Sequence, residues 1–245
     1  MSTVYDRIIN SQNAIAILID PDKFSMQNSE DFLRKLNLAQ PDFIFVGGST
    51  VSKTDFDTCI LELKKKTFAP LIIFPGGAHQ IHEAADCILF LSLLSGRNPD
   101  YLIGHHIAAA DEISKMKIEV IPTSYLLIDG GKKTSVEFVS QTTPIPHDQE
   151  SLARKIALAG MLQGKKITYL DAGSGAINMV SESMIKQVKT INLPLIIGGG
   201  IRTIEQVKTV HGAGANIVVI GNRIEEDIEF LLDLANYQKN KNEMA

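Results

Sequence analysis

Residues 168–176, TYLDAGSGA, combine a carboxylate with a glycine-rich backbone. Asp171 directly follows residues that suit a buried strand, and Gly173 and Gly175 flank Ser174. A carboxylate can take a proton from a reacting hydroxyl, and glycine lets backbone N–H groups come close to an anion. The same residue types also form ordinary turns. The segment is therefore a candidate site whose role depends on what its neighbours supply.

Two further glycine clusters follow apolar runs later in the chain. Gly198, Gly199 and Gly200 end one run, and Gly221 with Asn222 ends the next. Glycine permits a tight turn after a strand, but it also opens the start of the next helix to a phosphate group. In a TIM barrel the phosphate site commonly lies after strands seven and eight. Because the two clusters lie one barrel unit apart, they favour phosphate binding over turn formation alone.

Oxygen-bearing side chains stand at the ends of two early runs. One run ends in Asp20, which Pro21 and Asp22 follow, and Ser49 comes after the next run. Mg²⁺ prefers oxygen ligands and often shares them with substrate phosphates. We therefore predict Asp20 and Ser49 as magnesium ligands, with Asp22 a weaker candidate. The alternative is a solvated turn in which an aspartate caps a helix.

The elements that would position these residues are strands alternating with helices. Continuous apolar runs, which are typical of parallel strands covered on both faces, occupy residues 14–20, 43–48, 71–77, 87–94, 119–128, 167–173, 194–200 and 216–222. Helical spacing of apolar residues appears at residues 28–38, 148–163, 182–191 and 203–211. Eight strand–helix units predict an α/β fold, a TIM (β/α)8 barrel that forms a single domain over residues 1–245. A doubly wound open sheet is the alternative. Gly130 and Gly131 predict a small β-hairpin insertion near residues 128–140.

Composition excludes several classes of protein. The 245 residues carry a net charge of −4 and no basic stripe, so we expect no nucleic-acid partner. No apolar run reaches the roughly 18 residues that span a bilayer, and the first residues do not resemble a signal peptide. These features predict a cytoplasmic protein. Cys59 and Cys87 are expected to be buried free thiols, and the histidines at 79, 82, 105 and 106 to lie on helix surfaces.

Seven ordered segments resemble the geranylgeranylglyceryl phosphate synthase family, and its second group in particular. They are LIDPDK, VGGSTV, LIIFPGG, FLSLLSGRNPDYLIG, YLDAGSGA, GGGIRT and VIGN, and together they cover nearly the whole chain. Members of this family are prenyltransferases that join sn-glycerol 1-phosphate to a polyprenyl diphosphate. The resemblance implies Mg²⁺ at Asp20 and Ser49. It also implies that glycerol 1-phosphate is bound by Tyr169, Leu170, Asp171, Ala172, Gly173, Ser174, Gly175, Gly199, Gly200, Gly221 and Asn222.

Two positions differ from the pattern of the family. Family members often carry glutamate where this chain has Asp171, so its carboxylate is one methylene shorter. The first group of the family has a lysine at the position of Leu18. The YLDAGSG loop still places a carboxylate for the acceptor hydroxyl beside glycine N–H groups for its phosphate. Asp171 is therefore the predicted catalytic base.

The prenyl chain requires a dry groove rather than specific polar contacts. The segment FLSLLSGRNPDYLIG is the most apolar stretch near the expected barrel mouth, with Leu91, Leu93, Leu94 and Tyr101. Tyr101 is the predicted groove residue, although most of the leucines would be core residues in any barrel. Bound Mg²⁺ would take up the charge that develops on the leaving diphosphate.

The expected function is the Mg²⁺-dependent formation of an ether bond between sn-glycerol 1-phosphate and geranylgeranyl diphosphate. The products would be geranylgeranylglyceryl phosphate and diphosphate. The alternatives are another phosphate-binding barrel enzyme, such as a sugar-phosphate isomerase or an FMN-dependent oxidoreductase, and a non-catalytic binder of lipid or phosphate. The resemblance also implies a homo-oligomer, either a dimer or a hexamer. We expect at most transient membrane contact, for release of the lipid product.

Overall fold

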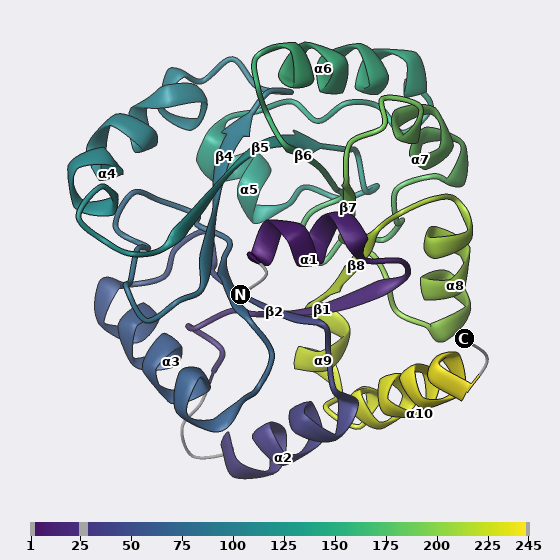
Figure 1. Cartoon of the computed structure of the whole chain (residues 1–245). Coiled ribbons are helices and arrows are strands. Elements are labelled where there is room, and N and C mark those ends of the chain that lie inside the picture. The colour runs from purple at the N-terminus through teal and green to yellow at the C-terminus, as the bar shows by residue number, and fades with distance from the viewer. Residues whose placement is uncertain (1–2, 25–28, 244–245) are drawn as a thin grey trace.

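A computed structural model describes residues 3–24 and 29–243, and within them eight parallel strands close into a barrel (Figure 1). The strands are β1 (Ala14–Ile19), β2 (Phe43–Val46), β3 (Leu71–Ile73), β4 (Cys87–Leu93), β5 (Glu119–Leu127), β6 (Ile167–Asp171), β7 (Leu195–Gly198) and β8 (Ile217–Ile220). Pairing of β1 with β8 closes the sheet, with Ala14 opposite Ile217. The predicted TIM barrel is confirmed, and the open-sheet alternative is excluded.

Each strand is buried on both faces, which explains why its sequence is continuously apolar. Successive side chains of a strand point to opposite faces of the sheet. In β2, Phe43 and Phe45 fill the barrel interior, while Ile44 and Val46 pack in the outer layer beneath the helices. All four side chains are buried. If apolar and polar residues alternated along the strand, polar side chains would be buried in one of these two layers.

The helices form a ring around the barrel (Figure 1). They are α2 (Ser29–Ala39), α3 (Lys53–Lys66), α4 (His105–Ile113) with a preceding π-helix, η2 (Asp100–Gly104), α6 (Glu150–Leu162), α7 (Glu182–Lys189), α8 (Ile204–Gly212), α9 (Asn222–Glu226) and α10 (Phe230–Glu243). The four helices expected at 28–38, 148–163, 182–191 and 203–211 match α2, α6, α7 and α8. Residue 28, the expected start of the first, lies outside the described residues.

The expected β-hairpin near residues 128–140 is wrong. This segment instead contains a short helix, α5 (Ser135–Ser140), whose first turn Thr134 caps. Gly130 does not join two strands, because its backbone lies against the loop after β6. A Cβ at Gly130 would come within 2.6 Å of the Ala176 side chain. Close packing, rather than a turn between strands, explains the glycine here.

A second departure lies between β3 and β4. Residues 74–86, all of them described, contain no helix, so the barrel lacks one of its outer helices at this position. His79 and His82 therefore lie in a loop and not on a helix surface. The Nε2 atom of His79 is 2.7 Å from the carbonyl oxygen of Val51, which ties the loop to the segment after β2.

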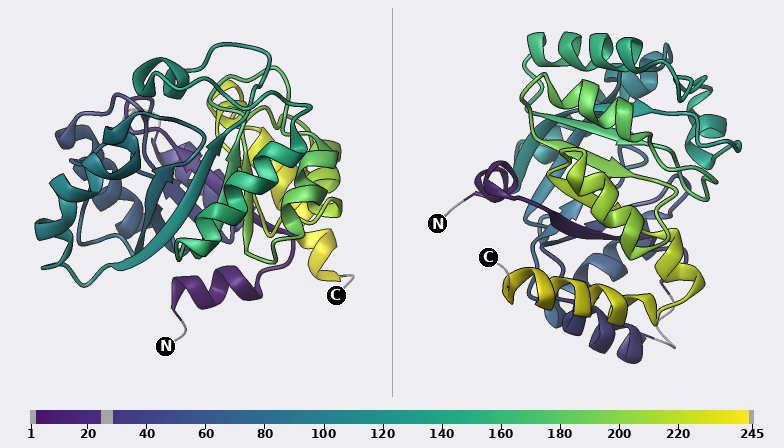
Figure 2. Two further views of the ribbon diagram at one scale, coloured as in Figure 1. Left: turned by 90° about the horizontal axis from the view of Figure 1, so that it is seen from above. Right: turned by 90° about the vertical axis from the view of Figure 1, so that its right-hand side faces the viewer.

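The amino-terminal end of the barrel is closed by a helix, α1 (Val4–Asn10), which lies beneath the strands in Figure 2. Val4 and Ile8 belong to the apolar cluster inside the barrel. The backbone N–H groups of Val4 and Tyr5 donate to the Glu119 carboxylate at 2.6 and 3.2 Å. The carboxyl ends of the strands therefore form the end at which a ligand can enter.

Two expectations from composition can be compared with the structure. Cys59 and Cys87 are both free and buried, as predicted. Within the part of the chain that the structure describes, no helix is long and apolar enough to cross a bilayer.

Candidate active site

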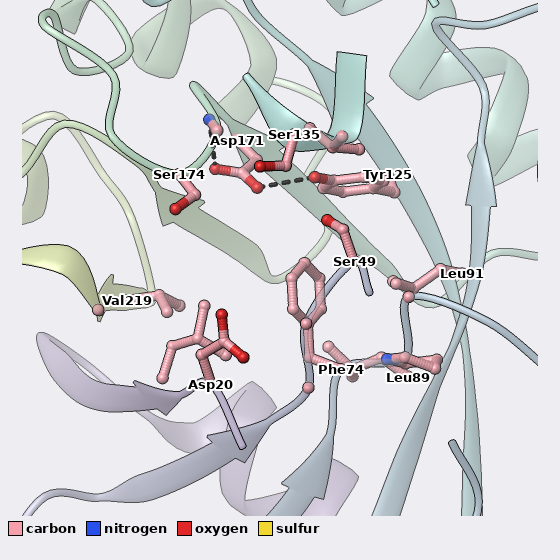
Figure 3. A pocket seen from close by; sticks show the side chains of 18 of the residues that line it. Asp20, Ser49, Phe74, Leu89, Leu91, Tyr125, Ser135, Asp171, Ser174 and Val219 are labelled. Atoms are coloured by element: carbon pink, nitrogen blue, oxygen red, sulfur yellow. Dashed lines mark hydrogen bonds between the residues drawn. The ribbon is translucent and has the colours of Figure 1, made fainter. Parts of the chain in front are cut away.

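A pocket of about 300 Å³ opens at the carboxyl ends of the strands (Figure 3). It brings together most of the residues predicted to form the site. Those that line it are Asp20, Ser49, Tyr101, Tyr169, Asp171, Gly173, Ser174, Gly175, Gly199, Gly200, Gly221 and Asn222. They come from both ends of the sequence, and barrel closure makes them neighbours.

Leu170 and Ala172 are the two predicted substrate-binding residues that do not line the pocket. Both side chains are buried in the apolar layer between the strands and the helices. Strand alternation explains this, because Tyr169 and Asp171 point inward and the residue between them must point outward. Leu170 and Ala172 therefore position the loop from behind.

Asp171 is the last residue of β6 and is only 8% exposed. The Tyr125 hydroxyl donates to its Oδ2 atom at 2.7 Å, and the Gly173 N–H donates to Oδ1 at 2.7 Å (Figure 3). Burial raises the pKa of Asp171, and the two hydrogen bonds oppose that rise. A raised pKa moves this carboxyl toward the pH range in which a base both accepts and releases a proton.

An aromatic layer supports this carboxylate from inside the barrel. The ring of Phe74 stacks on that of Tyr169 with centroids 5.0 Å apart. Tyr125 meets both rings edge-on, at 5.6 Å in each case. Tyr125 and Tyr169 are also partners in the register between β5 and β6. The donor to Asp171 is therefore held by packing on two sides.

The glycine loops after β6 and β7 approach each other too closely for any side chain. Gly199 has φ +82°, and a Cβ there would lie 2.6 Å from the Gly173 nitrogen. The Gly175 N–H donates to Oδ1 of Asn222 at 2.7 Å. The Nδ2 atom of Asn222 donates to the Ser174 hydroxyl at 3.0 Å. Asn222 thus ties the start of α9 to the loop after β6, beside glycines that line the pocket.

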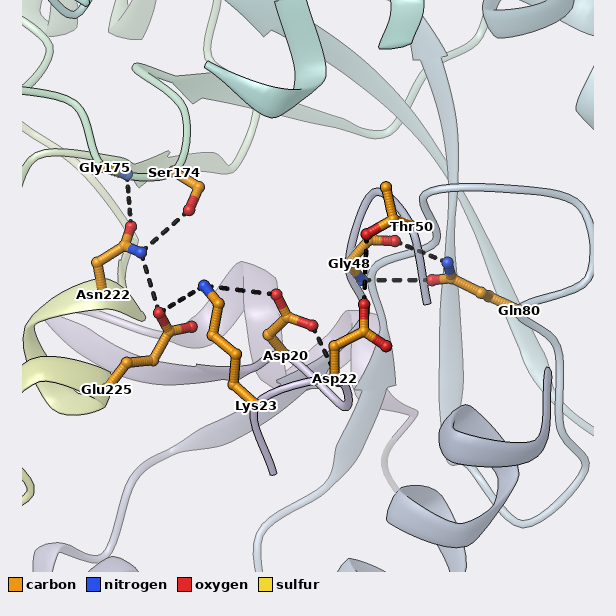
Figure 4. A network of polar contacts seen from close by, with 10 residues as sticks. All are labelled: Asp20, Asp22, Lys23, Gly48, Thr50, Gln80, Ser174, Gly175, Asn222 and Glu225. Carbon is orange, nitrogen blue, oxygen red and sulfur yellow. Dashed lines mark hydrogen bonds and ion pairs between the residues drawn. The ribbon is translucent and has the colours of Figure 1, made fainter. Parts of the chain in front are cut away.

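Asp20 occupies the opposite wall, at the end of β1, where Gly48 lies against it. A Cβ at Gly48 would be 2.7 Å from Oδ1 of Asp20. The buried amide of Gln80 fixes this approach, since its Nε2 donates to the Gly48 carbonyl oxygen at 2.7 Å and its Oε1 accepts from Gly76 at 3.1 Å. Gln80 therefore holds the loops that follow β2 and β3 in place next to Asp20 (Figure 4).

A chain of polar contacts links Asp20 to Asn222 across the mouth (Figure 4). The Lys23 ammonium lies 3.6 Å from the Asp20 carboxylate and 2.7 Å from that of Glu225. Glu225 in turn accepts from Nδ2 of Asn222 at 3.1 Å. Burial raises the pKa of Asp20, and the charge of Lys23 opposes the rise. Burial also lowers the pKa of Lys23, but its contacts with Glu225 and Asp20 outweigh that effect and raise it.

The oxygen ligands around Asp20 fit a magnesium ion whose coordination shell is completed by substrate oxygens. Asp20 and Ser49 both line the pocket and offer a carboxylate and a hydroxyl. Within the described residues, no group of three or more His, Cys, Asp or Glu side chains could hold a metal by itself. Mg²⁺ is usually bound through one or two carboxylates together with substrate phosphates and water. The two residues therefore suit an ion whose remaining ligands come from water or from a phosphate-bearing substrate.

One arm of the pocket is apolar and is lined by residues of β4 and α4. Its walls include Leu89, Leu91, Leu93 and Tyr101, together with residues of the helix-free segment after β3. Leu94, which was expected at this rim, instead packs in the outer layer. The arm suits a hydrocarbon chain, because nearly every side chain along it is aliphatic or aromatic.

His105 and His106 also line this arm, although we expected them on a helix surface. His106 stacks on Phe90 with centroids 3.9 Å apart, and its Nε2 lies 2.6 Å from the Leu91 carbonyl oxygen. Burial lowers its pKa, and the backbone contact with Leu91 opposes this. A largely neutral imidazole can pack beside a hydrocarbon chain.

Comparison with known proteins decides the family. A model of the PcrB family matches residues 7–238. The chain belongs to the PcrB family. A geranylgeranylglyceryl phosphate synthase of Zunongwangia profunda is 48% identical over 230 residues, which are 92% of this chain and 98% of that relative. One of Pyrococcus furiosus is 39% identical over 85% of this chain and 83% of that relative. The resemblance that the sequence predicted is confirmed.

Solved structures agree with this PcrB-family assignment. The (S)-3-O-geranylgeranylglyceryl phosphate synthase of Thermoplasma acidophilum, solved with its substrate sn-glycerol-1-phosphate, has a TM-score of 0.89. It is 36% identical, and the match covers 96% of each chain. The tryptophan synthase α-subunit of Pyrococcus furiosus, at 13% identity and a TM-score of 0.58, shares the fold alone.

Several residues of this PcrB-family pocket were missed by the sequence analysis. They are Tyr125, Lys23, Glu225, His105 and His106. Lys23 could have been found, since it follows Asp20 in the LIDPDK segment, and Glu225 lies one helical turn after Asn222. Tyr125 gave no such signal, because its role depends on a strand register that only the closed barrel defines.

Proposed function

We propose that this chain joins sn-glycerol 1-phosphate to geranylgeranyl diphosphate through an ether bond and releases diphosphate, with Mg²⁺ as cofactor. As a member of the PcrB family with relatives named geranylgeranylglyceryl phosphate synthase, it is a prenyltransferase. The observation that carries the proposal is one pocket with three parts. A buried carboxylate stands beside bare glycine backbone, an aspartate and a serine face them, and an apolar arm leads away.

The acceptor lies between Asp171 and the glycine loops. Its phosphate lies against Gly175 and takes backbone N–H groups near Gly199, Gly200 and Gly221, where the absence of side chains permits close approach. Its free hydroxyl then reaches the Asp171 carboxylate. As the new C–O bond forms, Asp171 takes the hydroxyl proton, and the electron pair of the breaking bond leaves with diphosphate. This arrangement requires a phosphate and a hydroxyl on the same small molecule.

The donor lies along the other side of the pocket. Asp20 and Ser49 would hold Mg²⁺, which would supply Lewis-acid stabilisation of the leaving diphosphate. The hydrocarbon chain follows the apolar arm past Leu91 and Tyr101. The arm excludes water from the carbon that reacts, and this favours attack by the acceptor hydroxyl over attack by water.

Turnover is the experiment that tests this function. Purified protein is incubated with radiolabelled sn-glycerol 1-phosphate, Mg²⁺ and prenyl diphosphates of 15, 20 or 35 carbons, and the lipid product is extracted. We expect product with the 20-carbon donor, and none when either substrate is omitted. No product with any donor would contradict the proposal. A bound yellow flavin, or isomerisation of a sugar phosphate, would support one of the alternative barrel enzymes instead.

Assembly and location belong to the same proposal and rest on the family resemblance. We expect a homo-oligomer, a dimer or a hexamer, in the cytoplasm, with transient membrane contact when the lipid product leaves. Light scattering at micromolar concentration measures the mass directly. A monomeric mass would refute the oligomer.

A further inference from the structure

Asp171 receives a hydrogen bond from a side chain that has no assigned role. The Tyr125 hydroxyl lies 2.7 Å from Oδ2 of Asp171, and both residues line the pocket. Tyr125 is 6% exposed, so water hardly competes for this contact. The second carboxylate oxygen is held by the Gly173 N–H at 2.7 Å. Each oxygen of Asp171 thus has one fixed donor and keeps a lone pair for the acceptor hydroxyl.

The strand register explains how Tyr125 reaches this position. Asp171 pairs with Leu127, and Tyr125 stands two residues earlier on the same face of β5. A diagonal neighbour of this kind is within reach of a long aromatic side chain. Contacts with Phe74 and Tyr169 hold the ring of Tyr125, so the hydroxyl is delivered by a packed scaffold. Removing the hydroxyl alone would leave that packing in place.

We propose that Tyr125 is a positioning residue for proton transfer: its hydroxyl fixes the orientation of the Asp171 carboxylate and stabilises its charged form. The inference rests on the proposed function, because it assigns Tyr125 a role in the same step. Tyr125 keeps its own proton throughout. Asp171 takes the proton of the acceptor hydroxyl as the ether bond forms and the bond to diphosphate breaks.

Few other groups near Asp171 can influence its pKa. The titratable neighbours are Tyr125 on β5 and Tyr169 on β6, and burial keeps the pKa of both phenols well above the usual value. α5 contributes Ser135 to this part of the pocket, and the loop after β7 contributes Gly199 and Gly200. Among the described residues, no lysine, arginine or histidine forms an ion pair with Asp171. Loss of the Tyr125 hydroxyl would therefore change the pKa of the Asp171 carboxyl directly.

The test is the pH profile of Tyr125→Phe. A hydrogen bond to the charged form lowers a pKa, so its removal raises the pKa of Asp171. We expect the acid limb of kcat/KM to move upward by about one pH unit, given the usual strength of a hydrogen bond to a charged group. Tyr237→Phe, which removes a hydroxyl on α10 outside the pocket, is the matched control and should leave the limb unchanged.

A second measurement separates positioning from mere support of the fold. In an Asp171→Asn background, adding Tyr125→Phe should change the residual kcat by less than threefold, because the residue acts through the carboxylate. An unchanged acid limb, or full additivity of the two substitutions, would overturn the inference while wild-type turnover stands. Absence of wild-type turnover would instead overturn the proposed function. Thermal melting of Tyr125→Phe confirms that the compared proteins are folded.

Discussion

Asp171 and Asp20 lie on the wall of the same pocket, but their surroundings differ. Asp171 is almost fully buried and is held by neutral donors, a phenol and a backbone N–H. Asp20 keeps 24% of its side chain exposed and has the Lys23 ammonium 3.6 Å away. Burial raises the pKa of both carboxyls. Only Asp20 has a cation that favours its permanent charge, so Asp171 suits proton transfer and Asp20 suits ion binding.

The backbone around the two aspartates differs in the same way. At Asp171, glycines with positive φ pack against each other and Asn222 ties the loops together. At Asp20, Lys23 forms a partly exposed ion pair with Glu225 at 2.7 Å and lies 3.6 Å from the Asp20 carboxylate. The pocket wall around Asp171, the proposed acceptor end, is therefore closely packed, whereas the wall around Asp20, the proposed cation end, is built from partly exposed charges. Four substitutions test this difference, from the largest expected effect to the smallest.

Asp171→Asn should have the largest effect. It keeps the size of the side chain but removes the base, and loss of a general base typically lowers the rate by about 10²–10⁴-fold. We expect kcat to fall by that factor at saturating Mg²⁺ and both substrates, with little change in melting temperature. Activity within threefold of wild type would mean that the carboxylate serves only the turn.

Asp171→Glu is the matched control for this change. It keeps the carboxylate, and family members often carry glutamate here, so it should retain far more activity than Asp171→Asn. The structure adds one condition, since the longer side chain must fit beside the Tyr125 hydroxyl 2.7 Å away. A glutamate variant as inactive as the asparagine variant would show that geometry, and not charge, limits the reaction.

Gly199→Ala should break the rigid end of the pocket. Its φ of +82° is unfavourable for alanine, and the new methyl would lie 2.6 Å and 2.8 Å from the backbone nitrogens of Gly173 and Ala172. Left-handed geometry costs about 1–2 kcal/mol for a residue with a Cβ, and overpacking adds about 1–3 kcal/mol. We expect the free energy of unfolding to fall by about 2–5 kcal/mol, measured by urea denaturation.

Gly212→Ala provides the control for Gly199→Ala. Gly212 ends α8 and does not have positive φ, and a Cβ there would meet no atom within 4 Å. Alanine there should be neutral or stabilising by up to about 1 kcal/mol, as is usual for this change in a helix. Equal losses at both positions would mean that the glycine loops are not the rigid part of the pocket.

The barrel could be predicted from the sequence because its signal is repeated. Eight continuous apolar runs each carry the same information, and the glycines at their ends mark the mouth. Predictions that depended on a single local signal were less reliable. Gly130 and Gly131 suggested a hairpin, although Thr134 followed by Glu137 three residues later is a helix-capping pattern that matches α5.

The individual contacts of the site could not be predicted in the same way. Asp171 was found because a carboxylate among glycines is unusual, whereas Tyr125 is an aromatic residue whose burial in the interior of the barrel needs no special role. The hydrogen bond from Tyr125 to Asp171 depends on the register between β5 and β6. The residue types of either strand alone do not determine that register. Successive side chains along a strand point to opposite faces, so Leu170 must point away from the face that carries Asp171. This rule alone excludes the Leu170 side chain from the pocket.

Asp20→Asn should affect the cation end by a smaller factor. It keeps a neutral oxygen but removes the charge that attracts a divalent ion, so the Mg²⁺ concentration for half-maximal activity should rise by about tenfold or more. Asp22→Asn is the comparison, because the Asp22 carboxylate is engaged by the Thr50 hydroxyl at 3.3 Å and should matter less. Unchanged Mg²⁺ dependence in Asp20→Asn would remove Asp20 from the proposed metal site.

Glu225→Gln should have the smallest effect. It removes the charge opposite Lys23, but the amide oxygen of glutamine can still accept from Nδ2 of Asn222. The side chains of Lys23 and Glu225 are 49% and 24% exposed, and ion pairs in such positions contribute about 0–1 kcal/mol. We expect the free energy of unfolding to fall by less than about 1 kcal/mol, and by less still in high salt. Glu226→Gln, which removes the exposed pair with Arg202, is a suitable control. A loss above about 2 kcal/mol for Glu225→Gln alone would make this contact a fixed support, and the cation end as rigid as the acceptor end.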